Sequence, residues 1–73
     1  PVDIFIDGAA RGNPGESGIG VYIAEGGKPL REIKKYLGTS TNNQAEYTAL
    51  ITALEAAKDL KNRQIRIFTD SML

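Results

Sequence analysis

Residues 44–61 limit the possible folds most, because they contain neither Gly nor Pro and are rich in Ala and Leu. Such residues favour an α-helix, here one of about five turns. Thr41 and Gln44 have the spacing of a capping box, which predicts the start of the helix. On a helical wheel the apolar side chains gather on one side, so the helix is expected to pack on another element. That stripe consists of Leu50, Ala53, Leu54, Ala57 and Leu60.

The segments on either side of this helix alternate between apolar and polar residues, which is typical of β-strands. The alternation predicts strands at residues 2–7, 19–23 and 65–70, and residues 30–37 are a plausible further strand. Residues 8–18 contain four glycines and one proline, which predicts a loop.

The order of these elements predicts the topology. Glu-Gly-Gly-Lys at residues 25–28 is typical of a hairpin turn, so the second and third strands should be antiparallel. The helix then leads, through a right-handed crossover, to a fourth strand parallel to the first. The sequence therefore predicts an α/β fold of order β-β-β-α-β, with three antiparallel strands, a crossover helix and one parallel strand. A length of 73 residues allows one domain.

The composition excludes several kinds of chemistry. The chain has no cysteine and no histidine, which rules out disulfide scaffolds, zinc fingers and catalytic sites built on histidine. Carboxylates remain, and these favour hard cations such as Mg²⁺. Nine basic residues balance nine acidic ones, so any nucleic-acid binding must be local. No apolar run reaches the length of a membrane span and no signal peptide is visible, so we expect no membrane contact and a cytoplasmic location.

Two aspartates follow similar apolar strands. Asp7 ends the first in Ile-Phe-Ile-Asp-Gly (4–8), and Asp70 ends the fourth in Ile-Phe-Thr-Asp-Ser (67–71). If these strands are parallel neighbours, both carboxylates emerge at the sheet end where ligands bind in open α/β sheets. The Phe two residues before each Asp shares its face, so we expect both carboxylates at the rim of a buried surface.

Glu46 lies near the centre of the apolar stripe of the helix, so it is expected to point toward the sheet. Three carboxylates at one point repel one another and lose solvation, which costs several kcal/mol unless a cation neutralises them. Taken singly, each Asp could instead begin a turn or cap a helix. Together, Asp7, Glu46 and Asp70 favour a divalent-metal site.

With three further segments, these residues resemble the ribonuclease H type 1 family. The motifs are Ile-Phe-Ile-Asp-Gly (4–8), Gly-Asn-Pro-Gly (12–15), Thr-Asn-Asn-Gln-Ala-Glu (41–46) and Thr-Asp-Ser (69–71). Each is weak alone, but their order and spacing make the resemblance specific, and it covers essentially the whole chain. It implies the ribonuclease H-like fold and endonucleolytic cleavage of the RNA strand in RNA–DNA hybrids.

The resemblance also implies the site residues. Asp7, Gly8, Glu46 and Asp70 would form the metal site and the three carboxylates the catalytic set, with two Mg²⁺ ions, or Mn²⁺ as a substitute. One ion would activate a water and the other would stabilise the leaving 3′ oxygen. Small residues and amides would line the minor groove of the hybrid, close to its 2′-hydroxyls. These are Gly12, Asn13, Asn42, Asn43, Ser71 and Met72. An ordinary turn at residues 12–15 and N-capping by the two helix asparagines are the structural alternatives.

The family domain is considerably longer than this chain, and its later carboxylate has no counterpart here. We therefore expect residues 1–73 to be the N-terminal half of the domain and inactive by themselves. The fourth strand would be an open sheet edge, and one apolar face of the helix would lack a partner. That face lies around Leu50, Ile51, Leu54 and Tyr47. We expect self-association, or a C-terminal half, to cover them.

Two other interpretations remain open. The first is a non-catalytic module that binds hybrids or dimerises. The second is another ribonuclease H-like nuclease, such as a resolvase or integrase relative. The Asn-Asn-Gln-Ala-Glu segment at residues 42–46 argues against the second.

Overall fold

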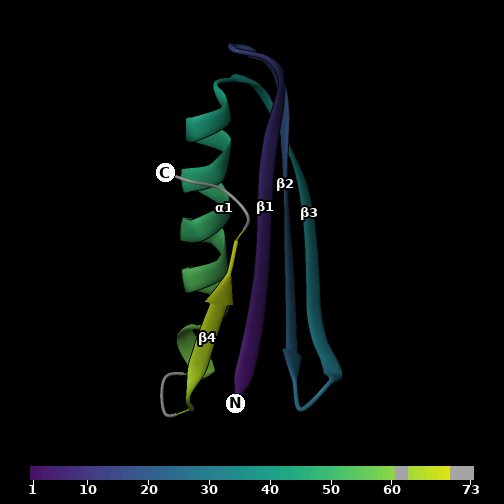
Figure 1. Ribbon diagram of the computed structural model, residues 1–73, viewed down its shortest axis with the longest axis vertical. Coiled ribbons are helices and arrows are strands. Elements are labelled where there is room, and N and C mark those ends of the chain that lie inside the picture. The colour runs from purple at the N-terminus through teal and green to yellow at the C-terminus, as the bar shows by residue number, and fades with distance from the viewer. Residues whose placement is uncertain (61–62, 70–73) are drawn as a thin grey trace.

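The computed structural model describes residues 1–60 and 63–69. One α-helix lies along one face of a four-stranded sheet of order β3-β2-β1-β4 (Figure 1). The elements are β1 (Val2–Gly12), β2 (Gly15–Glu25), β3 (Lys28–Ser40), α1 (Asn42–Ala56), the short 3₁₀ helix η1 (Lys58–Leu60) and β4 (Ile65–Phe68). The first three strands are antiparallel and β4 runs parallel to β1. The predicted β-β-β-α-β order and mixed sheet are confirmed.

β1 and β2 extend farther than their alternation predicted. Of residues 8–18, expected to form a loop, only Asn13 and Pro14 form the turn. The others continue both strands, and the pairing runs without interruption to Gly12 opposite Gly15. The glycine-rich part of β2 also pairs with β3, so its backbone groups have partners on both sides. Pairing on two sides therefore outweighs the low strand propensity of glycine.

The turn predicted between the second and third strands is confirmed. β2 ends at Glu25 and β3 begins at Lys28. Gly26 and Gly27, between them, have φ angles of 57° and 81°. A two-residue turn of the tightest hairpin type needs positive φ at both positions, which glycine adopts without steric strain.

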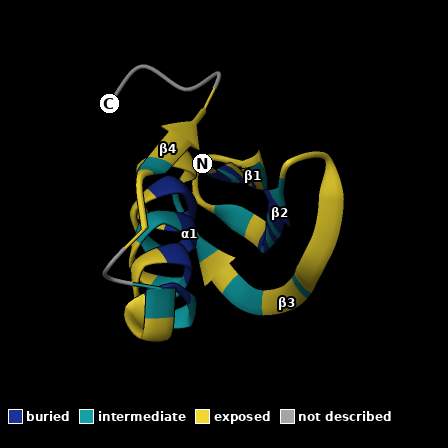
Figure 2. Ribbon diagram, turned by 90° about the horizontal axis from the view of Figure 1, so that it is seen from below, coloured by how far each residue is buried: buried dark blue, intermediate teal, exposed yellow. Residues whose placement is uncertain are grey.

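The core lies between the sheet and α1 (Figure 2). The sheet contributes branched aliphatic side chains, and the helix contributes alanines that let it lie close to the strands. The core residues are Val2, Ile4, Ile6, Ile19, Val21, Ile23, Ala49, Ala53 and Ala57. No helix among the described residues is long and apolar enough to cross a membrane.

The predicted stripe packs on the sheet, with Ala53 and Ala57 buried and Leu50 and Leu60 partly buried against the core. α1 differs from its prediction at one residue of that stripe and in its length. Leu54 was expected in the buried stripe beside Ala53, but it is 52% exposed. The helix carries two apolar faces, and the face of small alanines packs on the sheet while the face of larger side chains points outward. α1 also ends at Ala56 rather than residue 61, where the chain tightens into η1.

Candidate functional site

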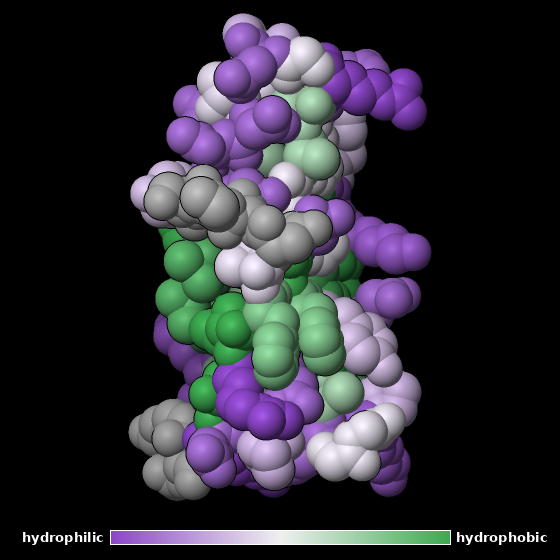
Figure 3. Space-filling view, viewed as in Figure 1, coloured by the Kyte–Doolittle hydropathy of each residue, from purple (hydrophilic) through white to green (hydrophobic). Residues whose placement is uncertain are grey.

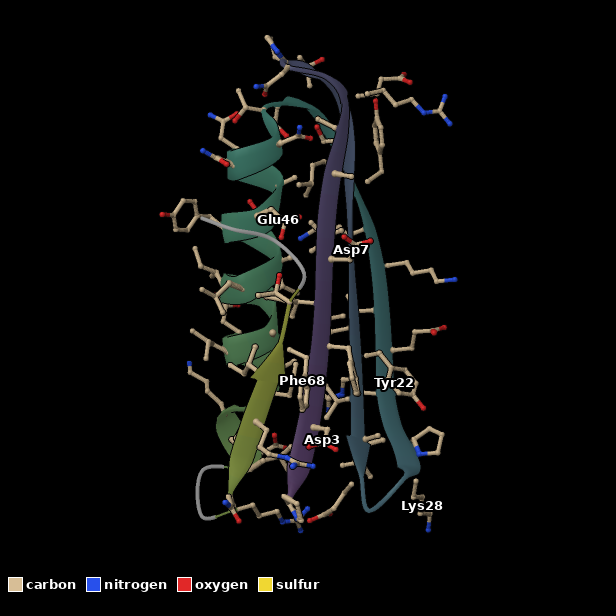
Figure 4. The ribbon with its side chains drawn as sticks, viewed as in Figure 1. Asp3, Asp7, Tyr22, Lys28, Glu46 and Phe68 are labelled. Atoms are coloured by element: carbon tan, nitrogen blue, oxygen red, sulfur yellow. The ribbon has the colours of Figure 1, made fainter. Side chains whose placement is uncertain are left out.

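Glu46 is held in the contact between α1 and β1, with its side chain directed at the strand (Figure 4). It is only 5% exposed. Its Oε1 accepts a hydrogen bond of 3.0 Å from the backbone N–H of Gly8. Its Oε2 is buried and has no hydrogen-bond partner among the described residues. A buried carboxylate oxygen without a partner is unfavourable, so this position suits a cation.

The helix approaches β1 this closely because residue 8 is glycine. A Cβ atom at Gly8 would lie 2.5 Å from the carbonyl oxygen of Ala45 and 2.9 Å from the nitrogen of Glu46. Both are backbone atoms, which cannot turn aside as a flexible side chain can. Gly8 therefore sets the distance between α1 and β1 at the point where the Glu46 carboxylate binds the strand.

Asp7 lies next to this contact but on the other face of the sheet, because successive strand residues alternate between faces. Asp7 and Glu46 lie at similar heights along β1 (Figure 4). Asp7 is exposed and lines an open groove with Gly20 and Lys34. The expectation that Asp7 lies at the rim of a buried surface is wrong, since Phe5 on the same face is 45% exposed. No described element covers this face of the sheet.

Asp70, Ser71 and Met72 lie outside the described residues. The strand that leads to them is described, and it pairs with β1 from Ile65 opposite Val2 to Phe68 opposite Phe5. The predicted parallel pairing of the two strands is confirmed, and the two phenylalanine rings stack at 4.9 Å. No group of three acidic side chains within residues 1–60 and 63–69 could hold a metal ion. The three-carboxylate site therefore stays a prediction.

Three of the predicted substrate contacts meet where the β1–β2 turn approaches the start of α1. Asn42 Oδ1 accepts from the N–H of Ala10 at 2.8 Å. Asn13 Oδ1 accepts from the N–H of Asn42 at 3.0 Å. Gly12, beside Asn13, is exposed and has a φ of 93°. Asn43 is exposed on α1 and makes no side-chain hydrogen bond within the described part of the chain.

The helix start confirms one prediction and adds one contact that was not foreseen. Thr41, rather than either asparagine, is the N-cap, and it forms the predicted capping box with Gln44. Ala10 takes part through its backbone N–H, and no side-chain pattern in the sequence marks such a group. Asn42 therefore binds β1 through its side chain and the β1–β2 turn through its backbone N–H, instead of capping its own helix.

An ion pair fastens β4 to β1 at the opposite end of the strands. The guanidinium of Arg66 donates two hydrogen bonds, of 2.8 and 3.1 Å, to the carboxylate of Asp3. These bonds lower the pKa of Asp3 below its usual value and raise that of Arg66. Arg66 also lies over the ring of Phe68, 5.7 Å from its centre.

Comparison with known proteins identifies the family. A model of the RNase H family matches residues 1–73. The chain belongs to the RNase H family. Ribonuclease HI of Halobacterium salinarum is 47% identical over 73 residues, which make up 99% of this chain and 37% of that protein.

Solved RNase H structures share the fold. LC11-RNase H1, isolated from compost, superposes with a TM-score of 0.90 at 45% identity, covering 96% of this chain and 54% of that one. A crystal structure of LC11-RNase H1 in complex with an RNA/DNA hybrid gives a TM-score of 0.89 at 42% identity, with 97% and 55% covered. The predicted ribonuclease H-like fold is confirmed, and this chain spans about half the length of these RNase H1 chains.

Proposed function

We propose that this chain supplies part of a metal-dependent RNase H active site that hydrolyses the RNA strand of RNA–DNA hybrids. The observation that carries the proposal is the buried Glu46 carboxylate, whose Oε2 has no partner among the described residues. If Glu46 served only the fold, a neutral residue of similar shape could be buried there with a smaller loss of free energy. Membership of the RNase H family and the hybrid complex of LC11-RNase H1 support the choice of substrate.

Asp7, Gly8, Glu46 and Asp70 are the proposed metal-binding residues. Mg²⁺ prefers carboxylate and carbonyl oxygens, and Mn²⁺ accepts the same ligands. A bound pair of ions would supply an activated water and stabilise the leaving 3′ oxygen. The chain's own contribution is to hold Glu46 through the N–H of Gly8, while β1 carries Asp7 at a similar height on the other face of the sheet.

The proposed substrate-binding residues are small or carry neutral amides. Gly12, Asn13, Asn42 and Asn43 are all exposed at one end of the molecule, and Ser71 and Met72 complete the proposed set. Amide groups can bond to 2′-hydroxyls and to base edges in the minor groove of the hybrid. Because these groups are uncharged, their contribution to binding should depend little on salt.

We further propose that hydrolysis needs more protein than residues 1–73. The chain spans 37% of the Halobacterium ribonuclease and about half of the solved RNase H1 chains. An apolar band crosses the middle of the molecule, over α1 and β4 (Figure 3), and includes the exposed Ile51, Leu54 and Ile67. A second copy, or a C-terminal half of the domain, would cover this band and the edge of β4. The cytoplasmic location stays a prediction.

The deciding experiment follows the cleavage of a labelled RNA strand in an RNA–DNA hybrid. Reactions would contain Mg²⁺ or Mn²⁺, several protein concentrations, and Asp7→Asn as a control for contaminating nucleases. Cleavage that rises steeply with concentration and is lost in Asp7→Asn would support assembly of the site by two copies. Cleavage only when the C-terminal half of an RNase H is added would support an incomplete site.

A non-catalytic module is the second candidate, and the exposed apolar band is the observation that favours it. Such a module would bind the hybrid or dimerise without hydrolysis. Absence of cleavage even with an added C-terminal half, together with retained hybrid binding, would favour this candidate. The resolvase or integrase alternative finds no support in the match to the RNase H family.

A further inference from the structure

Along the edge of β1 that faces β4, the backbone N–H groups bind first β4 and then α1. In the described part of the chain, β4 pairs with β1 only from Val2 to Phe5. At the start of this edge, the N–H of Val2 donates to the carbonyl oxygen of Gln64 at 2.7 Å. Donors alternate between the two edges of a strand, so the N–H groups of Gly8 and Ala10 point to the same edge as that of Val2. Side chains of α1, not β4, bind these later donors.

The spacing of the two side chains matches the spacing of the two donors. Glu46 Oε1 accepts from Gly8 at 3.0 Å, and Asn42 Oδ1 accepts from Ala10 at 2.8 Å. Four residues along a helix rise about 6 Å, and two residues along a strand span about 6.7 Å. The two side-chain oxygens on the first turns of α1 are therefore spaced nearly like the carbonyl oxygens that a neighbouring strand would offer to β1.

We propose that Asn42 is a positioning residue for Glu46. This inference rests on the proposed function, because it assumes that Glu46 binds the metal. The bond from Ala10 to Asn42 fixes the start of α1 against β1, and so fixes where the Glu46 carboxylate meets the strand one turn later. Asn13 strengthens the arrangement, since its Oδ1 accepts from the N–H of Asn42 and ties the β1–β2 turn to the helix. A ligand held in place before binding loses less entropy when the metal binds.

The positioning role and the proposed substrate contact use different atoms of Asn42. Its partner at Ala10 is a backbone N–H, so the oxygen of the amide must face that donor. The Nδ2 group is then left to donate to substrate. Asn42→Asp keeps an oxygen for Ala10 and removes the donor, whereas Asn42→Ala removes both. The two substitutions therefore separate positioning from substrate binding.

The first measurement is amide hydrogen exchange by NMR on the 73-residue chain, without metal. In the unchanged chain, Gly8 and Ala10 should exchange slowly, although both lie beyond the part of β1 that pairs with β4. Asn42→Ala should speed exchange at both amides about tenfold or more, and Asn42→Asp should not. Asn43→Ala is the matched control, because Asn43 is the next residue and makes no side-chain bond among the described residues; it should leave both amides unchanged.

The second measurement is broadening of the Gly8 amide signal by Mn²⁺. Asn42→Ala should require several-fold more Mn²⁺ for the same broadening, while Asn42→Asp should require no more than the unchanged chain. Unaltered exchange at Gly8 in Asn42→Ala, or an Asn42→Asp variant that behaves like Asn42→Ala, would overturn the inference.

The test still decides under two unfavourable outcomes. If Asn42→Ala fails to fold, the unchanged chain and Asn42→Asp still decide, because fast exchange at Ala10 in either one contradicts the proposed bond. If Mn²⁺ broadens no signal near Gly8 in the unchanged chain, the proposed metal site fails and Glu46 has no ligand to be positioned for. Exchange and metal binding thus separate failure of the positioning role from failure of the proposed function.

Discussion

We expect Glu46 to lower the stability of the metal-free chain. Its Oε2 is buried without a partner among the described residues, and its carboxylate loses hydration that one hydrogen bond from Gly8 only partly replaces. A cation at this position would restore the lost interactions. Stability and metal binding should therefore respond in opposite directions when the charge of Glu46 is removed.

Glu46→Gln tests this opposition. The amide can still accept from Gly8, but it has no charge to desolvate, so the metal-free variant should be about 1 kcal/mol more stable. It should also lose any stabilisation by Mg²⁺. Urea unfolding with and without Mg²⁺ measures both effects, and Glu55→Gln, on the exposed side of α1, is the control. A metal-free Glu46→Gln variant that is less stable than the unchanged chain would contradict our account of Oε2.

Gly8 and Gly20 form a matched pair for testing the close approach of α1. Gly8→Ala places a Cβ against the backbone of Ala45 and should destabilise the chain by about 1–3 kcal/mol. Gly20→Ala meets no atom within 4 Å, so its effect should be within about 0.5 kcal/mol. The comparison uses urea unfolding midpoints. Equal stabilities would show that the helix can move away from β1 without loss.

At the scale of elements, β4 depends on few contacts. It is a short strand, Ile65–Phe68, that pairs with β1 on one side. The Asp3–Arg66 ion pair and the stacked rings of Phe5 and Phe68 lie along this pairing. β4 is therefore the strand whose attachment should respond most to pH.

The pKa of Asp3 is lower in the folded chain than in the unfolded chain, where it is about 3.9. The pair therefore stabilises the fold fully above that value, and its contribution is lost as the pH falls through the lower, folded pKa. Asp3→Asn should flatten the fall in unfolding free energy below about pH 4. Urea unfolding at several pH values measures this slope. Asp59 makes no ion pair with the described residues. Asp59→Asn should therefore change the slope of unfolding free energy against pH less than Asp3→Asn does.

At the scale of the whole molecule, the described elements cover only one face of the sheet. α1 packs on that face, while the larger apolar side chains of the helix point outward (Figures 2 and 3). Tyr47, Ile51 and Leu54 are each more than half exposed. Contiguous apolar surface of this kind favours association.

We expect the chain to associate as its concentration rises, and Leu54→Glu should shift it toward the monomer, because a charge in an apolar interface is costly. Sedimentation velocity over a range of concentrations measures this change, with circular dichroism to confirm that α1 is retained. Lys58→Glu adds the same acidic side chain outside the apolar face and also removes a basic one, so it changes the net charge more, yet it should have a smaller effect. A chain that is monomeric at all concentrations would contradict the expectation.

The fold was largely predictable, and the site only partly so. Alternation and the Gly- and Pro-free segment are local patterns, so they identify the element types, their order and the parallel pairing of β4 with β1. The loop expected at residues 8–18 was wrong because pairing with two neighbours is a long-range property. The place of Glu46 on the helical wheel correctly predicted that it faces the sheet. The exposure of Asp7 could not be predicted, since it depends on which elements cover the outer face.

The sequence by itself determined the succession of strands and helix, and it limited the available chemistry to carboxylates, hydroxyls and amides by omitting histidine and cysteine. Only the tertiary structure decided that Leu54 points away from the sheet and which oxygen of Glu46 lacks a partner among the described residues. It also decided that Asn42 and Glu46 bind alternate donors of β1. These contacts join residues more than thirty positions apart, and their geometry follows from the close approach at Gly8, which no local pattern encodes.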